Sequence, residues 1–556
     1  MADNARSRPV SDDSLKETFE SIVIAFILAF IFRAYVVEAF IIPTGSMAPT
    51  LLGAHVNVTC RECGYRYAVD VTRGNDENAT RVRSNLVATC PMCGYPNLIP
   101  AGTRIATGDR ILVHKYIYNL VEPARWDVVV FKNPQNPSVN FIKRLVGLPG
   151  EELYIIEGNL YSKPDTASDA AWHIDRKIDR SWDGAKVQNA VWQPIYHSQY
   201  VPLDNGDPAI SPQRQGVPWT TSPSGKPWTP ASDAAHWNLA GRDGYRYDSD
   251  APGSLRFDFQ DFQPRPHYAY DEVSGFYMND PRRFDGEPIE DIRLATAVQP
   301  DRPGLDLTLS TTARWGVPSG SSWRPVAGDK PITLAAHINA QGLATLSAPD
   351  QVDPATGRPL LLARANIGPL QAGVTYRVEL WYVDQSLSLW IDGRRVLLSE
   401  FELPIRELVD RDPLPVGYTP QVRIALSGSP AWFHNVELDR DLYYSSTNPL
   451  GMLARGGLAK RTGGWHEGGP VTIGLNQFFC MGDNSPLSHD SRYWDGVEPW
   501  IRYRMFPHVS EQSVEGMVPR QLMIGRAFFV YWPAMYSFRP DMVPLIPDFG
   551  DMRFIH

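Results

Sequence analysis

Residues 41–52 read IIPTGSMAPTLL and follow directly on an apolar segment. Proline fixes the backbone angle φ and glycine frees it, so this short stretch predicts a sharply shaped turn. One serine, Ser46, lies in the middle of the turn. On these residues alone an ordinary turn serine is the better interpretation, because serine is common in turns. A nucleophilic serine needs support from the rest of the chain.

The apolar run SIVIAFILAFIF occupies residues 21–32, upstream of the turn. Extended to Ile42, it reaches the roughly 20 residues that cross a bilayer. We therefore expect a disordered N-terminus at 1–17 and a transmembrane anchor at 18–42. Basic residues before the anchor favour a cytoplasmic N-terminus. A cleaved signal peptide and a buried helix of a soluble protein are the alternatives.

The chain has 556 residues, so several domains are expected. Its formal net charge of −9 argues against a general nucleic-acid binder, and we expect no nucleic-acid partner. The 16 tryptophans and 24 tyrosines favour β-structure over a helical bundle.

Four of the five cysteines form two C-x2-C-G-Y motifs. This spacing is typical of a zinc ribbon with four thiolate ligands, which we expect at 54–102 as a structural site. Two disulfides are the alternative if the domain faces an oxidising compartment. Cys480 is expected to be a small buried apolar residue. The expected zinc ligands are Cys60, Cys63, Cys90 and Cys93.

A lysine stands inside an apolar strand pattern at residues 141–150, FIKRLVGLPG. Lysine is rarely fully buried unless it is paired or functional. Lys143 is therefore a candidate for chemistry, and an edge lysine with its ammonium group in water is the alternative.

The middle of the chain differs in character. Residues 163–250 are rich in proline and tryptophan, and short strand patterns recur over 251–445. We expect two hairpins over 376–398 and a β-sandwich as a whole. The run LSLWIDGRRVL, at 387–397, resembles the laminin-G/concanavalin-like group. Such a domain would bind a glycan or a protein partner, or would serve as a spacer with its tryptophans in the core.

Four blocks stand in order along the chain: TGSMAPTLL at 44–52, GDRILVHKY at 108–116, FIKRLVGLPGE at 141–151 and MGDNSPLSHDSRYW at 481–494. Together they resemble the type I signal peptidase (leader peptidase) family. The resemblance implies a membrane-bound serine protease with a Ser-Lys dyad and a β-rich catalytic domain. Such an enzyme cuts signal peptides from exported preproteins after small residues.

The resemblance also implies a role for individual residues. Ser46 would be the nucleophile and Lys143 its general base, which must be neutral to accept a proton. Thr44 would supply an oxyanion hydroxyl and Ser488 would orient the lysine. The remaining matched residues would shape the site: the ion pair of Asp490 and Arg492, and the loop residues Gly482, Asp483 and Asn484.

The predicted fold class is mainly β. It comprises the N-terminal transmembrane helix and a catalytic domain built from 43–53, 103–162 and 474–556, with a linker at 446–473. The ribbon and the sandwich interrupt this domain, which is tolerable because the cost of closing a loop grows slowly with its length. The expected location is the cytoplasmic membrane, single-pass, with the catalytic domain on the extracytoplasmic side. The partners would be preproteins and membrane lipid, and no catalytic cofactor is expected.

Two other functions are compatible with parts of the sequence. The chain could be a catalytically inactive membrane-anchored binding protein whose sandwich holds a ligand. It could also be a self-cleaving Ser-Lys protease of the repressor type, although the apolar anchor and the absence of a DNA-binding helix pair disfavour this. His114 and His489 are expected to be surface or packing residues.

Overall fold

The computed structural model describes most of the chain. The described residues are 12–71, 79–178, 185–203, 227–241, 244–259, 270, 288–319, 322–325, 330–353, 356–412, 414–415, 418–444, 470–485, 487–494, 496–505, 514–533, 535–536, 546–547 and 549–556. Most of the predicted disordered N-terminus and most of the predicted linker at 446–473 lie outside these residues. The prediction of a mainly β protein is confirmed.

The first helix begins and ends earlier in the chain than the predicted anchor. Helix α1 spans Asp12–Tyr35, and strand β1 then spans Val37–Ile41. The predicted anchor at 18–42 therefore extended too far, because residues 37–41 pair with strand β6 (Arg110–Lys115) instead of continuing the helix. An ion pair of 3.0 Å between Glu38 and Lys115 supports this pairing. Among the described residues, no helix is both long enough and apolar enough to cross a bilayer.

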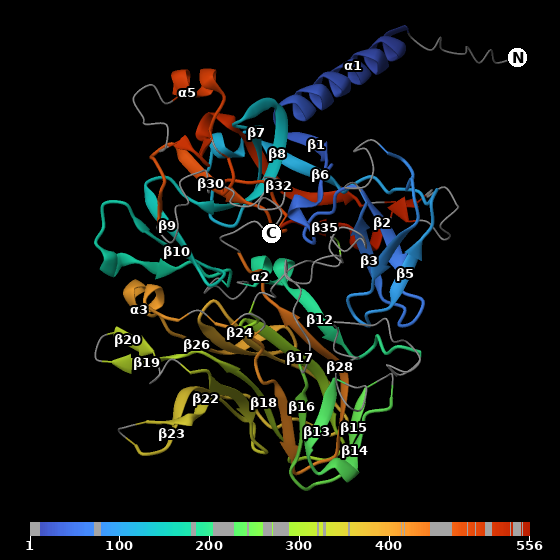
Figure 1. Ribbon diagram of the computed structural model, residues 1–556. Helices are drawn as coiled ribbons and strands as arrows, with labels where there is room; N and C mark the ends of the chain where they lie inside the picture. Colours follow the sequence, from blue (N-terminus) through green and yellow to red (C-terminus); the bar gives the residue numbers. More distant parts are fainter. Residues whose placement is uncertain are drawn as a thin grey trace, which may run out of the picture.

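One antiparallel sheet gathers strands from three distant parts of the chain (Figure 1). Its strand order is β1-β6-β32-β7-β8-β30-β31, and β35 pairs with β32. The further bounds are β7 Val128–Asn133, β8 Asn136–Gly147, β30 Gln477–Met481, β31 Val518–Pro519, β32 Met523–Trp532 and β35 Arg553–Phe554. The run of β-branched residues at the start of β7 is buried and anchors the centre of the sheet.

A smaller sheet continues from the first. It has the order β11-β10-β9-β29, with β9 at Glu151–Ile156, β10 at Asn159–Pro164, β11 at His173–Ile174 and β29 at Val471–Thr472. Because the sequence blocks at 108–116 and 141–151, which resemble signal peptidases, form strands of these sheets, we refer to the two sheets together as the peptidase-like region.

Two short hairpins carry the paired cysteines. Strands β2 (His55–Thr59) and β3 (Arg66–Asp70) flank the first pair, and strands β4 (Leu86–Thr89) and β5 (Pro96–Ile99) flank the second. Figure 1 shows this unit beside the main sheet.

Two larger sheets lie at the opposite end of the molecule from α1 (Figure 1). Their orders are β14-β15-β28-β17-β24-β25-β26, with β12 beside β28, and β13-β16-β27-β18-β21-β22-β23. The bounds in the first sheet are β12 Gln193–His197, β14 Trp237–Asn238, β15 Tyr245–Tyr247, β17 Ile292–Pro300, β24 Tyr376–Val383, β25 Ser386–Ile391, β26 Arg394–Glu400 and β28 Ala431–Arg440. Those in the second are β13 Trp228–Ser232, β16 Gly253–Phe257, β18 Asp306–Ala313, β21 Ile332–Ile338, β22 Leu343–Val352, β23 Pro359–Asn366 and β27 Arg423–Ser427.

The two predicted hairpins over 376–398 are present as β24, β25 and β26. Asp384, Gln385 and Asp392 have positive φ, as tight turns between such strands require. Outside the sheets are the small helices α2 (Lys186–Val191), α3 (Ile405–Val409) and α5 (Pro499–Met505), and the strand pairs β19 (Gly316–Ser319) with β20 (Ser322–Pro325) and β33 (Met535–Tyr536) with β34 (Ile546–Pro547).

The sandwich begins earlier than the sequence indicates. Strands β12 to β15 come from residues 193–247, within the segment 163–250 that we separated from the sandwich. They are only two to five residues long, so they show no clear hydrophobic period. Their aromatic side chains, including Trp228 and Tyr247, are nevertheless buried in the sandwich core.

Candidate active site

Ser46 lies on a tight turn at the end of β1. Residues Gly45–Met47 form a single 3-10 turn, which places Ser46 half-buried at its centre. Met47 and Leu51, which follow Ser46, are fully buried in an apolar cluster with Ile42, which precedes it. These anchors fix the loop, so the serine hydroxyl has a defined position beside the main sheet.

Lys143 comes from β8 and meets this serine. Its ammonium nitrogen Nζ donates a hydrogen bond to Ser46 Oγ at 2.7 Å, across 97 positions of sequence. A second bond of 3.0 Å goes to the carbonyl of Ile142. The side chain is 3 % exposed, so the alternative of an edge lysine with its charge in water does not describe this residue.

The environment of Lys143 disfavours its charged form. Burial lowers the pKa of Lys143 to about 8 from its ordinary value of 10.5, and the negative charges of Asp490 and Asp483 partly oppose this shift. A substantial fraction of this lysine is therefore neutral near pH 8. A neutral amine beside a serine hydroxyl can accept its proton.

The block at 481–494 contacts residues 43–53, which carry the predicted nucleophile Ser46 and which we call the nucleophile loop. Asn484 donates from its side-chain amide to the carbonyl of Gly45 at 3.0 Å and from its backbone N–H to the carbonyl of Ser46 at 3.2 Å. Gly482 allows a close approach, because a β-carbon there would lie 2.3 Å from the Ser46 carbonyl oxygen. These contacts hold the backbone on which Ser46 stands.

Asp490 and Arg492 form a fully buried ion pair, with 2.8 Å between Oδ2 and the guanidinium nitrogen. Asp490 also accepts a bond from the backbone N–H of Gly482. Burial opposes ionisation of Asp490, but the Arg492 guanidinium outweighs it and holds the pKa of Asp490 below its ordinary value. The pair therefore keeps its charges and braces the loop that carries Gly482.

Two predicted site residues make fewer contacts than the resemblance implies. Ser488 is fully buried, and among the described residues its hydroxyl makes no hydrogen bond of ordinary geometry, although it lies close enough to Asp490 to help lower the pKa of that carboxyl. Thr44 precedes the 3-10 turn in an extended conformation and makes no capping bond with its side chain. Their expected roles, orienting Lys143 and binding the oxyanion, stay predictions.

Sequence reasoning missed Arg144, the residue next to the lysine. Its side chain is fully buried and makes two bonds to Asp483, at 2.7 and 2.6 Å. It also donates to the carbonyl of Trp126 and to a backbone oxygen of His556, both at 2.9 Å. Strand alternation offered a signal, because consecutive strand residues face opposite sides and Arg144 must therefore point away from Lys143.

Two glycines that flank the cysteine hairpins also belong to the site. A β-carbon on Gly53 would lie 2.3 Å from the carbonyl carbon of Thr44, and one on Gly108 would lie 1.9 Å from the carbonyl oxygen of Ile42. The hairpins therefore leave and rejoin the peptidase-like region through backbone packed directly against the nucleophile loop.

The histidines take packing positions. His114 stacks on Phe528, with ring centroids 3.9 Å apart, and His489 accepts a bond from the Trp494 indole at 3.2 Å. Neither contact involves Ser46.

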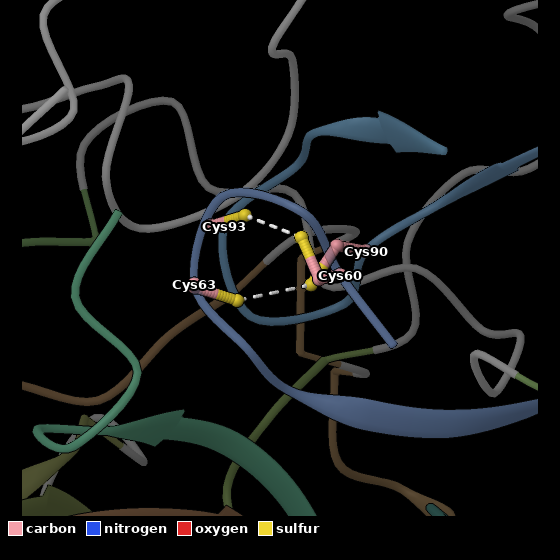
Figure 2. A group of neighbouring side chains, drawn as sticks. All are labelled: Cys60, Cys63, Cys90 and Cys93. Atoms are coloured by element: carbon pink, nitrogen blue, oxygen red, sulfur yellow. Dashed lines mark hydrogen bonds between the residues drawn. The ribbon is translucent and has the colours of Figure 1, made fainter. Parts of the chain in front are cut away.

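The four paired cysteines lie together, with their sulfur atoms turned toward one another (Figure 2). The sulfurs of Cys60 and Cys93 are 3.5 Å apart, and those of Cys63 and Cys90 are 3.6 Å apart. All are free thiols, so the structure contains neither of the alternative disulfides. Thiolates bound to one zinc ion at about 2.3 Å lie about 3.8 Å from one another. The cluster therefore fits zinc, and four sulfur ligands leave no open position for catalysis.

Comparison with known proteins finds signal peptidases that are similar to this chain in segments that include much of the peptidase-like region. The family model described as signal peptidase, peptidase S26, matches residues 101–202 and 455–532. Signal peptidase I of Rickettsia typhi is 27% identical over 182 residues, which cover 33% of this chain and 52% of that protein. Signal peptidase I of Aquifex aeolicus is 49% identical over 47 residues, 8% of this chain and 18% of that protein.

The chain thus spans about half the length of the Rickettsia relatives that it matches, and the predicted resemblance is confirmed. Among solved structures, a carbohydrate binding module from Bacillus subtilis aligns at 11% identity with a TM-score of 0.22, over 38% of this chain and 95% of that one. The Ca2+-bound exoplasmic/lumenal domain of VIP36 aligns at 14% identity with a TM-score of 0.23, over 40% of this chain and 88% of that one. At such scores neither likeness carries an argument about the sandwich.

Proposed function

We propose, from the premise that two segments of this chain resemble signal peptidases, that the protein is a serine endopeptidase that removes signal peptides from preproteins. The observation that carries the proposal is the 2.7 Å hydrogen bond between Lys143 Nζ and Ser46 Oγ, combined with the lowered pKa of a buried lysine. A serine hydroxyl is a weak nucleophile until a base takes its proton, and Lys143 is the base within reach.

The proposed reaction has two stages. Neutral Lys143 takes the proton of Ser46, whose Oγ attacks the carbonyl carbon at the cleavage site. The backbone N–H of Ser46 and the hydroxyl of Thr44 would bind the oxyanion that forms. The ammonium group of Lys143 then gives its proton to the departing amine. Water, activated by the same lysine, releases the signal peptide from Ser46 in the second stage.

The surroundings of Ser46 support a preference for small residues beside the cleaved bond. The loop side chains Ile42, Met47 and Leu51 fill one apolar cluster with Ile142 of β8. Such packing would leave room only for shallow pockets. We therefore propose cleavage after small, alanine-like residues.

Helix α1 supports a membrane anchor in the proposed function. Its apolar side chains are exposed, including Val23, Ile24 and Phe26 at 53%, 56% and 61%. Exposing apolar area of this kind to water costs free energy, and contact with lipid removes that cost. We propose that α1 attaches the protein to the cytoplasmic membrane, with the peptidase-like region on the extracytoplasmic side.

The test is cleavage of a preprotein with an Ala-x-Ala site by the full chain in detergent. Ser46→Ala and Lys143→Ala are each expected to lower kcat by at least about a thousand-fold, because either change removes the nucleophile or its base. Two control variants change exposed residues: Ser138→Ala on β8, the strand that carries Lys143, and Lys132→Ala on the neighbouring strand β7. Both are expected to cleave the preprotein at the wild-type rate.

If Ser46→Ala or Lys143→Ala cleaved at the wild-type rate, the proposal would be wrong. If the wild-type chain produced no cleavage at all, the inactive binding protein considered above would be the better interpretation.

A further inference from the structure

The space beside Gly45 is filled by an aromatic ring from a distant part of the chain. A β-carbon on Gly45 would lie 2.0 Å from Cε1 of Tyr270, much closer than unbonded atoms approach. The Tyr270 ring therefore rests directly on the backbone that precedes Ser46.

Tyr270 is itself held firmly. It is 3 % exposed and packs in one apolar cluster with Ala48 and Met481. Its hydroxyl donates to the carbonyl of Ala54 at 3.3 Å. The ring thus spans from Gly45, near the start of the nucleophile loop, to Ala54, just after that loop ends.

This residue belongs to the sandwich insertion by sequence. It lies between β16 and β17, which are strands of the two different sandwich sheets. Asn484 holds the carbonyls of Gly45 and Ser46 from the block at 481–494. The Gly45–Ser46 peptide is therefore held by two separate parts of the chain, one of which comes from the inserted sandwich.

We propose that Tyr270 is a positioning residue for Ser46, and that the sandwich insertion thereby takes part in peptide-bond cleavage. The inference rests on the proposed peptidase function. The Gly45–Ser46 peptide carries the N–H that would bind the oxyanion and sets the direction of the Ser46 side chain. A displacement of about 1 Å at such a point costs about a hundred-fold in rate.

The first test compares Tyr270→Ala with Tyr270→Phe in steady-state cleavage of an Ala-x-Ala preprotein. Tyr270→Ala is expected to lower kcat by about ten- to a hundred-fold, with KM changed less than about three-fold. The pH at which activity is half-maximal is expected to stay the same, since none of the charges that shift the pKa of Lys143 lies on Tyr270. Tyr270→Phe keeps the ring and is expected to restore most of the lost kcat. Wild-type kcat in Tyr270→Ala, or equal losses in the two variants, would overturn the proposal.

The second test uses the close contact itself. Gly45→Ala places a methyl group where the Tyr270 ring lies, and it is expected to lower kcat by about a hundred-fold. The backbone of Gly45 is not in the left-handed region, so alanine meets no backbone strain there. In Gly45→Ala/Tyr270→Ala the methyl group has room, and the double variant is expected to exceed Gly45→Ala in kcat.

These outcomes separate the two proposals. Losses that simply multiply in the double variant, or wild-type kcat in Gly45→Ala, would contradict the positioning role even if Tyr270→Ala folded poorly. If the variants contradicted the positioning role of Tyr270 while the wild-type chain still cleaved the preprotein, the peptidase proposal would stand. If the wild-type chain did not cleave it, both the peptidase proposal and the positioning proposal would be wrong.

Discussion

At the scale of the residue, the proposed chemistry depends on one buried amine. Lys143 is buried, yet Asp490 and Asp483 lie near enough to oppose its loss of charge. The balance leaves its pKa at about 8, where a small change of pH changes the fraction of neutral base. A fully apolar pocket would lower the pKa further, and an exposed lysine would stay charged.

This balance predicts the pH dependence of cleavage. Below pH 8 Lys143 is mainly protonated and cannot accept the Ser46 proton, so kcat/KM is expected to rise with pH and to level off above about pH 8. The measurement is kcat/KM between pH 6 and 10 in detergent, buffered at constant ionic strength. Lys143→Arg serves as the control, because arginine does not lose its proton in this range and should be inactive throughout. A profile that fell as pH rose from 6 to 8 would contradict the assignment of Lys143 as the base.

At the scale of the element, the cysteine hairpins form a unit built by local turns. In each hairpin the glycine after the second cysteine has positive φ, at Gly64 and Gly94, and donates its N–H to the carbonyl of the first cysteine. The repeated turn is what the repeated C-x2-C-G-Y motif predicts. Hydrogen bonds already join the two hairpins: the N–H of Arg61 donates to Asn97 Oδ1 at 3.1 Å, and the Tyr67 hydroxyl donates to the carbonyl of Ala88 at 3.1 Å. A metal ion on the four sulfurs would add a further link between them.

We predict one structural zinc ion per chain at this cluster. Cys93→Ser removes a thiolate and is expected to abolish zinc retention after dialysis, because the other ligands bind zinc more weakly without it. Zinc content by elemental analysis and free thiols by titration are the measurements. Cys480→Ala is the matched control, since Cys480 is buried in a different apolar cluster and should leave the zinc content at one. Purified wild-type protein without zinc and with two disulfides would contradict the prediction.

At the scale of the whole molecule, a buried charge cluster joins the sandwich to the peptidase-like region. Lys177 follows β11 and reaches Asp384 at 2.7 Å and Asp441 at 2.8 Å, both on the sandwich. The chain beyond Asp441 then continues into the peptidase-like core through Leu442 and Tyr444. The sandwich is thus attached by packed side chains as well as by chain connections.

Lys177→Met is expected to destabilise the chain by about 3–5 kcal/mol, because it leaves two buried carboxylates without their cation. The free energy of unfolding in denaturant measures the loss. Arg302→Met breaks an exposed ion pair with Asp250 and is expected to cost less than about 1 kcal/mol, so it serves as the control. Equal, small losses in both variants would show that the cluster does not hold the two regions together.

The prediction from sequence succeeded where the signal was local. Side-chain identity and short spacing indicated the cysteine site, the turns at Asp384–Gln385 and Asp392, and Lys143 as a candidate for chemistry. Ser46 was singled out only through the resemblance to signal peptidases, and the catalytic roles of Ser46 and Lys143 stay predictions. It failed at the boundary after Tyr35, where apolar β-branched residues suit a helix or a strand equally well. It also failed over 193–247, where strands are too short to show a period and only packing against β16 and β28 defines them.

The sequence by itself determined which chemical groups this protein can use: one serine in a shaped turn, one lysine in an apolar strand and four cysteines at a metal-binding spacing. Only the tertiary structure decided that Lys143 Nζ lies 2.7 Å from Ser46 Oγ and that Arg144 faces the other way onto Asp483. The same holds for Tyr270 on Gly45. The physical reason is that turn geometry and ligand spacing are properties of a few adjacent residues. A contact between distant residues depends on strand register and packing, which the whole chain sets together.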